Sequence, residues 1–182
     1  MKTLIVVDPQ YDFVTGTLPV PGAEDALNRL SDKLIRIAPD QIIVTMDCHP
    51  IGHVSFEPSG GVWPVHCVKY SHGAAVWEPL MKAIQASNVT TLFLEKGRAM
   101  DKDEYSAFGA SFPDILNGAD SIMVCGLAGD VCVLNSIMDL LKHGLGSKLC
   151  VIEDASPSLD GGEKLQAFIR ENNLKAITLD AK

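Results

Sequence analysis

Apolar residues occur along the chain in short runs, and these runs alternate with stretches in which apolar positions recur every three or four residues. The runs predict six strands, at residues 3–8, 41–47, 90–96, 121–127, 148–155 and 175–179. The amphipathic stretches predict helices at 27–37, 77–88, 130–143 and 162–173. Continuous apolar strands are typical of parallel sheets that are covered on both faces. The alternation therefore predicts an α/β fold with a mostly parallel, doubly wound sheet and right-handed crossovers.

Residues 48–76 break this pattern. The segment is long, rich in Gly, Pro and His, and has no periodicity. Long irregular loops in compact domains tend to be functional. The loop begins within VTMDCHPIGHVSF (44–56), where a buried strand ends in an acid followed by two histidines.

Length and charge narrow the class of protein. The 182 residues suit one domain, 1–182, and the net charge is −8. This charge argues against nucleic-acid and anionic-membrane partners, because both require a basic surface. No apolar run approaches the ~18 residues of a membrane span, and Asp8 lies where a signal peptide would remain apolar. We therefore expect a cytoplasmic protein.

The five cysteines form no tight CxxC pair, which is a poor framework for disulfides. In a reducing compartment they are thiols. Cys125 and Cys150 lie within apolar strands and are interpreted as core residues, whereas Cys67, beside His66, is ambiguous. Cys132 differs from these because it lies in the first turn of a predicted helix, where the helix dipole stabilises a thiolate.

Polar side chains follow several of the predicted strands. Asp8 ends the first strand, Lys96 ends the third, and Cys132 comes after the glycine-rich turn that follows the fourth. In open α/β sheets the ligand site lies beyond the carboxyl ends of the strands, so these residues should meet there. An acid, a lysine and a cysteine together make an activated nucleophile. Taken singly, they would equally suit a turn residue, a solvated strand end and a packed core thiol.

The irregular segment adds metal-binding chemistry. Asp47, His49, His53 and His66 supply one carboxylate and three imidazoles within twenty residues. This donor set suits Zn²⁺, Fe²⁺ or Mn²⁺, and the alternative is a solvated loop. Phe13 lies near the same edge, and with the two tryptophans it would either line an aromatic pocket or plug the loops.

Several motifs, taken in order, resemble one known family. They are VDPQYDF (7–13), LPVPGAEDAL (18–27), TMDCHPIGHVSF (45–56), WPVHC (63–67), EKG (95–97), EYSAF (104–108) and GLAGDVCV (126–133). Together they are similar to the nicotinamidase/pyrazinamidase branch of the isochorismatase-like cysteine hydrolases. The resemblance implies a six-stranded sheet in the order 3-2-1-4-5-6 with helices on both faces.

The resemblance also implies residue roles. A catalytic triad would fall on Asp8, Lys96 and Cys132. Metal ligands would fall on Asp47, His49 and His66, with His53 as a further ligand in some members. The amides of Ala128 and Cys132 would stabilise an oxyanion, next to a cis peptide between Leu127 and Ala128. Substrate-binding side chains are expected at Phe13, Trp63, Tyr105 and Leu127.

The implied activity is hydrolysis of nicotinamide and pyrazinamide-like carboxamides to the acid and ammonia through a thioester, as part of NAD salvage. One divalent transition metal is expected, with zinc ahead of iron and manganese, and homo-oligomerisation is left open. The alternatives are a sister hydrolase acting on isochorismate or an N-carbamoyl compound, or a non-catalytic metal-binding protein. The chain departs from the family pattern at Tyr11, Cys48, Gly129 and Val131.

Overall fold

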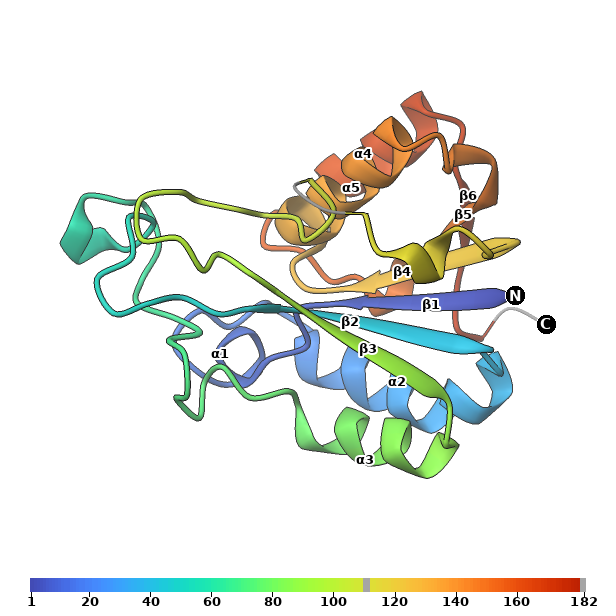
Figure 1. The fold of residues 1–182 in the computed structure, drawn as a ribbon, viewed down its shortest axis with the longest axis horizontal. Coiled ribbons are helices and arrows are strands. Elements are labelled where there is room, and N and C mark those ends of the chain that lie inside the picture. Colours follow the sequence, from blue (N-terminus) through green and yellow to red (C-terminus); the bar gives the residue numbers. More distant parts are fainter. Residues whose placement is uncertain (110–111, 181–182) are drawn as a thin grey trace.

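A computed structural model shows a sheet of six parallel strands with helices on both faces (Figure 1). Of the predicted domain, 1–182, the structure describes residues 1–109 and 112–180. The strand order is β3-β2-β1-β4-β5-β6, so the predicted order is confirmed. The strands are β1 Lys2–Val7, β2 Gln41–Asp47, β3 Thr90–Lys96, β4 Ser121–Gly126, β5 Leu149–Ile152 and β6 Lys175–Ile177.

The described part of the chain contains five α-helices. They are α1 Tyr11–Val14, α2 Ala23–Ile37, α3 Glu78–Ser87, α4 Leu134–Lys142 and α5 Glu163–Glu171. Helices α2 and α3 lie on one face of the sheet, and α4 and α5 on the other (Figure 1). No helix in the described part of the chain has the length and apolar character needed to cross a bilayer.

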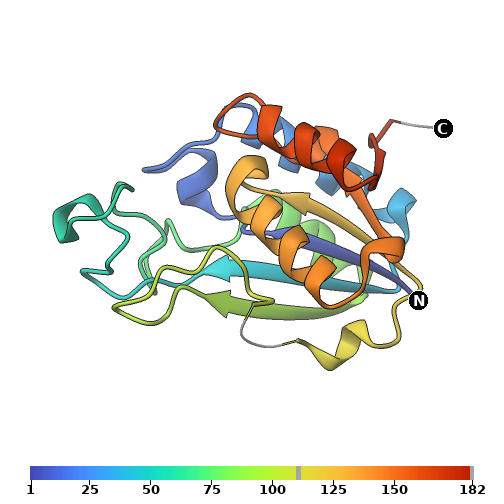
Figure 2. The same cartoon turned by 90° about the horizontal axis from the view of Figure 1, so that it is seen from above.

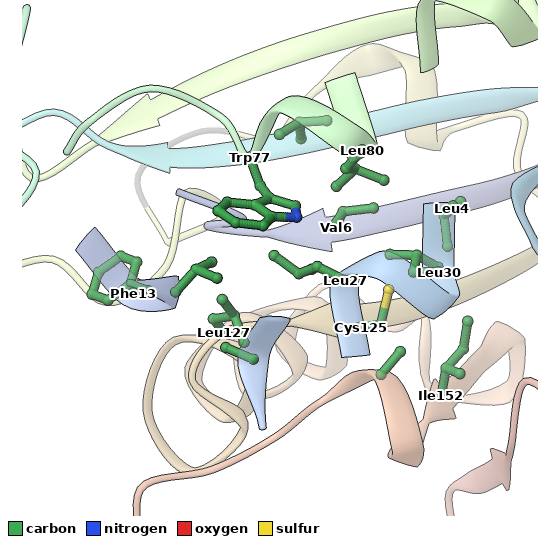
Figure 3. Close-up of a cluster of buried hydrophobic side chains, with 14 of the residues drawn as sticks. Leu4, Val6, Phe13, Leu27, Leu30, Trp77, Leu80, Cys125, Leu127 and Ile152 are labelled. Atoms are coloured by element: carbon green, nitrogen blue, oxygen red, sulfur yellow. The ribbon is translucent and has the colours of Figure 1, made fainter. Parts of the chain in front are cut away.

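Each face has its own hydrophobic cluster. Leu27, Leu30 and Leu80 project from α2 and α3 onto the side chains of Leu4 and Val6 in β1 (Figure 3). All five side chains are fully buried. Full burial of such a side chain contributes roughly 1.5–3 kcal/mol, so these contacts hold β1 rigidly at the centre of the sheet.

Four strands end earlier than predicted, at residues 7, 126, 152 and 177 instead of 8, 127, 155 and 179. The fifth strand stops at Ile152, because Glu153–Ala155 forms a 3₁₀ turn closed by a hydrogen bond from Ser156 N to Glu153 O of 3.0 Å. The first strand stops at Val7, because Asp8 has a φ of 46°, which is outside the β region. The edge strands β3 and β6 also contain exposed residues, since each has a neighbour on one side only.

The irregular segments gather at one end of the sheet. Residues 48–76 and 97–108 extend together beyond the carboxyl ends of β2 and β3, away from the N-terminus (Figures 1 and 2). This is the edge at which the sequence predicts the functional residues.

Candidate active site

Asp8, Lys96 and Cys132 meet beyond the carboxyl ends of three strands. Lys96 Nζ lies 2.7 Å from Asp8 Oδ2 and 3.5 Å from Cys132 Sγ. The hydroxyl of Thr45 donates a hydrogen bond of 2.6 Å to the other oxygen of the Asp8 carboxylate. All three predicted residues are buried. The structure therefore brings together the acid, the lysine and the cysteine that the sequence analysis singled out.

Cys132 belongs to a wide turn that leads into α4. Residues Gly129–Val133 form a π-helical turn, and the peptide between Leu127 and Ala128 is cis, as the resemblance implied. The amide of Ala128 makes no hydrogen bond within the described residues, so it is available to an oxyanion. Gly129 is required by close packing, because a Cβ there would lie 2.3 Å from Ser158 Oγ.

Burial and charge determine the protonation of this group. Burial is the largest cause that raises the pKa of Cys132 well above its ordinary value. Lys96 lowers this pKa, whereas Asp8 and Asp47 raise it. Burial therefore opposes the thiolate that the sequence analysis expects the helix start to stabilise. Burial also raises the pKa of Asp8 despite the nearby ammonium of Lys96. A carboxylate of raised pKa is better suited to accept a proton from the thiol.

Asp47, His49 and His66 form a second cluster beside the first. The imidazole Nε2 atoms of His49 and His66 lie 3.5 and 3.8 Å from Asp47 Oδ2. Tetrahedral ligands at about 2.1 Å from a zinc ion lie roughly 3.4 Å apart, so three ligands fit with little movement. The other oxygen of Asp47 contacts Lys96. Burial alone would raise the pKa of Asp47, but Lys96 and His49 hold it well below its usual range.

The hydrogen bonds of the two imidazoles fix their tautomers. His49 Nδ1 lies 2.9 Å from Gly97 O, and His66 Nδ1 lies 2.7 Å from Pro64 O. Because a carbonyl only accepts, each ring donates from Nδ1–H and its Nε2 keeps a lone pair directed at the cluster. This arrangement, in which the outer nitrogen is bonded and the inner one is free, is typical of metal-binding histidines. The donor set therefore fits a divalent metal.

His53 has a different environment. Its Nδ1 lies 2.7 Å from Ser55 Oγ and its Nε2 lies 3.0 Å from Lys102 O, so both ring nitrogens are already engaged. Its ring stacks against that of His49, with the centroids 4.2 Å apart. In this structure His53 supports the cluster from outside. The ligand groups of Asp47, His49 and His66 lie within reach of one another, and Asp47 is also within reach of Asp8 and Cys132.

Gly97 provides space for His49. Its φ is +65°, and a Cβ at this position would lie 2.4 Å from His49 Cε1 and 2.6 Å from His49 Nδ1. The residue after Lys96 therefore has to be glycine, for both its backbone conformation and its close approach to the ring.

A hollow lies above both clusters. Its empty space, part of which is open to solvent, is about 400 Å³, and its lining includes Phe13, Trp63 and Tyr105 as well as His49 and Cys132. The Trp63 indole donates a hydrogen bond of 3.2 Å to the Tyr105 hydroxyl. Phe13 lies in the one-turn helix α1, with its ring centroid 5.4 Å from that of His66.

Residues in and after the glycine-rich turn have different environments. The Leu127 side chain is fully buried in the hydrophobic cluster of Figure 3 and is not among the described residues that line the hollow. Ala128 and Val131 line it instead. Val131, one of the departures from the family pattern, therefore shapes the apolar wall of the pocket. Trp77, the second tryptophan, packs in the same hydrophobic cluster as Leu127.

Sequence reasoning missed several residues of the site. The carboxylate of Asp12 is buried and accepts a hydrogen bond of 2.7 Å from the amide of Cys67, next to His66. Asp103 and Glu104 line the hollow with two further carboxylates. Gln10 contacts the main chain of Asp47. The available signal was that Gln10 and Asp12 are polar residues that share the motif VDPQYDF with Asp8.

The fold and this geometry describe a doubly wound α/β protein with a cysteine, a carboxylate and a lysine at its strand ends. Comparison with known proteins narrows the class. Residues 2–181 match the model of the isochorismatase domain, and the chain belongs to the isochorismatase family.

Its relatives point to one branch of that family. The chain is 30% identical to a nicotinamidase of Saccharomyces cerevisiae, over 97% of this chain and 99% of the relative. It is 35% identical to a nicotinamidase of Escherichia coli, over 84% and 81%. Among solved structures, the pyrazinamidase of Pyrococcus horikoshii in complex with zinc is similar, with a TM-score of 0.81 and 30% identity over 97% and 98% of the two chains.

Proposed function

We propose that this chain is a hydrolase that converts the carboxamide of nicotinamide, and of pyrazinamide-like rings, to the carboxylic acid and ammonia. The observation that carries the proposal is the meeting of Cys132, Asp8 and Lys96 below an aromatic hollow. Nicotinamidases similar to this chain over nearly its whole length support the choice of substrate.

In the acylation step the Cys132 thiol gives its proton to the Asp8 carboxylate as the sulfur attacks the amide carbon. The amides of Ala128 and Cys132 donate hydrogen bonds to the oxyanion. The protonated Asp8 then returns the proton to the leaving nitrogen, so that ammonia departs and a thioester remains. Lys96 holds Asp8 in place by their ion pair of 2.7 Å and stabilises negative charge at sulfur.

In the deacylation step Asp8 accepts a proton from water as the water oxygen attacks the thioester carbon. The carbon–sulfur bond breaks, the proton passes to sulfur, and the acid leaves with the Cys132 thiol restored. One carboxylate thus serves both halves of the reaction, as expected for a general acid–base residue next to a cysteine nucleophile.

We propose that Asp47, His49 and His66 hold one divalent metal. Two imidazoles and a carboxylate suit zinc, and the similar pyrazinamidase of Pyrococcus horikoshii was solved with zinc. When bound there, the metal supplies a coordination position that orients the ring of the substrate. The rings of Phe13 and Trp63 provide apolar surfaces on which an aromatic substrate packs.

We further propose a role for the enzyme in NAD salvage in the cytoplasm, where its thiols stay reduced. The test is ammonia release by zinc-loaded protein from nicotinamide, compared with pyrazinamide and an N-carbamoyl amine. Isochorismate contains no nitrogen, so its turnover is followed by pyruvate release. We expect turnover of the two ring carboxamides, and a nicotinoyl adduct on Cys132 when the reaction is quenched and analysed by mass spectrometry. Turnover of the N-carbamoyl compound or isochorismate alone would identify a sister hydrolase. Metal binding without any turnover would identify a binding protein.

A further inference from the structure

Gln10 is fully buried, and its side-chain amide makes three hydrogen bonds. Its Oε1 accepts a bond of 2.8 Å from the amide of Asp47, and its Nε2 donates bonds of 2.8 Å to Asp47 O and 2.9 Å to Ala74 O. Because the nitrogen faces two carbonyls and the oxygen faces an N–H group, only this orientation of the amide satisfies all three partners. The side chain therefore binds both main-chain polar groups of Asp47.

The position of Asp47 in the sheet explains this contact. The register of β1 with β2 ends where Val7 pairs with Thr45, two residues before Asp47. On the other side, β3 continues to pair with β2 as far as Asp47 and Lys96. The amide of Gln10 thus takes the place of a peptide group of β1, and completes the hydrogen bonding of the last residue of β2.

The same amide also links three parts of the site. Gln10 follows Asp8 by two residues, it holds the backbone of Asp47, and through Ala74 it reaches the end of the irregular segment that carries His66. Asp47 in turn contacts Lys96 with one carboxylate oxygen and faces the two imidazoles with the other. A shift of the Asp47 backbone would move both sets of contacts together.

We propose that Gln10 is a positioning residue that sets the Asp47 carboxylate for metal binding and for its contact with Lys96. The inference rests on the function proposed above. Residues that orient metal ligands typically change metal affinity or activity by about 10–100-fold when they are replaced, and this is the size of effect expected here.

The chain offers a matched control at the other end of the same strand. Gln41 begins β2, is 4% exposed, and its Nε2 donates bonds of 2.7 Å to Thr3 Oγ1 and 2.9 Å to Ile115 O. Gln10→Met and Gln41→Met therefore remove a buried amide with two donor bonds in each case. Both variants should lower the melting temperature, whereas only the first removes contacts with a metal ligand.

The measurement is a titration of metal-free protein with Zn²⁺ against a chromophoric chelator, together with kcat and KM for nicotinamide. We expect Gln10→Met to weaken zinc binding by about 10–100-fold and to lower kcat at saturating zinc, and Gln41→Met to stay within about twofold of the parent in both. Equal zinc affinities in the two variants would overturn the inference.

If Gln10→Met does not fold, Gln10→Glu replaces it, because glutamate has nearly the same shape and lacks both N–H donors. Zinc affinity equal to that of Gln41→Met would then again overturn the proposal, and a loss of about tenfold or more would support it. Measurements on the parent protein distinguish a failure of the proposed function from a failure of the role proposed for Gln10. A parent that neither binds zinc nor releases ammonia refutes the proposed function, whereas a competent parent with an unaffected Gln10 variant refutes only the role of Gln10.

Discussion

The two halves of the site are held in different ways. In the nucleophile half, Asp8, Lys96 and Cys132 lie at the ends of β1 and β3 and in the turn that enters α4. In the metal half, Asp47 ends a strand, but His49 and His66 lie in the irregular segment, and their orientation depends on bonds to two backbone carbonyls. Sheet register therefore determines the positions of the side chains in the nucleophile half, whereas local loop contacts orient the two histidines of the metal half.

The largest effect expected from this comparison is a loss of turnover in a protein that still folds and still binds zinc. Asp8→Asn removes the group that transfers protons in both steps, and it should lower kcat by at least ~10³. Because strand register holds this half, zinc affinity and folding should be retained. A stopped ammonia assay measures the loss of turnover, and a zinc titration measures whether metal affinity is retained. Loss of zinc binding or of folded protein would mean that the nucleophile half is not held independently of the metal half.

The second effect concerns the metal half. His49→Ala removes one of three ligands, and zinc affinity should fall by more than the ~100-fold expected for a supporting residue. His143→Ala is the control, since His143 bonds to Phe108 O at 3.1 Å on another part of the surface. Metal content after dialysis gives the measurement. Unchanged zinc in His49→Ala would remove this residue from the site.

A smaller effect tests the dependence on loop packing. Gly97→Ala places a methyl group against His49, and zinc affinity should fall by about 10–100-fold. Gly144→Ala is the matched control, because Gly144 has a φ of +77° and a Cβ there meets no atom of the described chain within 4 Å. Both variants bear the left-handed backbone penalty of about 1–2 kcal/mol. Equal zinc affinities would show that the close approach does not matter.

The smallest effect falls on the hollow that covers both halves. Tyr105→Phe removes the acceptor of the Trp63 indole bond. A hydrogen bond of this kind contributes about 0.5–1.5 kcal/mol, so KM should rise roughly 2–10-fold with kcat unchanged. Steady-state kinetics on nicotinamide decides the point. A fall in kcat without a change in KM would mean that Tyr105 acts in the chemistry.

The same contrast explains what the sequence could predict. Apolar runs gave β2 and β3 with their observed bounds, since strands buried in a sheet carry a strong local signal. Once the strands are ordered, Asp8, Lys96 and Cys132 must share one edge. The shorter β5 was mispredicted because Glu153–Ala155 continues the chain as a turn, and no periodic signal marks that change.

The residue types of the metal half indicated its candidate ligands. Residue types alone could not predict how those ligands are oriented. The carbonyls of Gly97 and Pro64, which fix the two imidazole tautomers, carry no side-chain signature. The raised pKa of Cys132 was also hidden, because it depends on burial and on carboxylates that come from distant parts of the chain. Gln10 was missed for a similar reason, since its partners are backbone atoms of residues 47 and 74.

The Asp47 carboxylate belongs to both halves, because one oxygen contacts Lys96 and the other faces His49 and His66. Binding events on its two sides are consequently linked by a single coupling free energy, and that coupling is reciprocal. If a reversible adduct on Cys132 changes the affinity for zinc by some factor, zinc changes the affinity for that same adduct by the same factor. A change in metal supply would then shift the occupancy of the nucleophile, and occupancy of the nucleophile would shift metal binding.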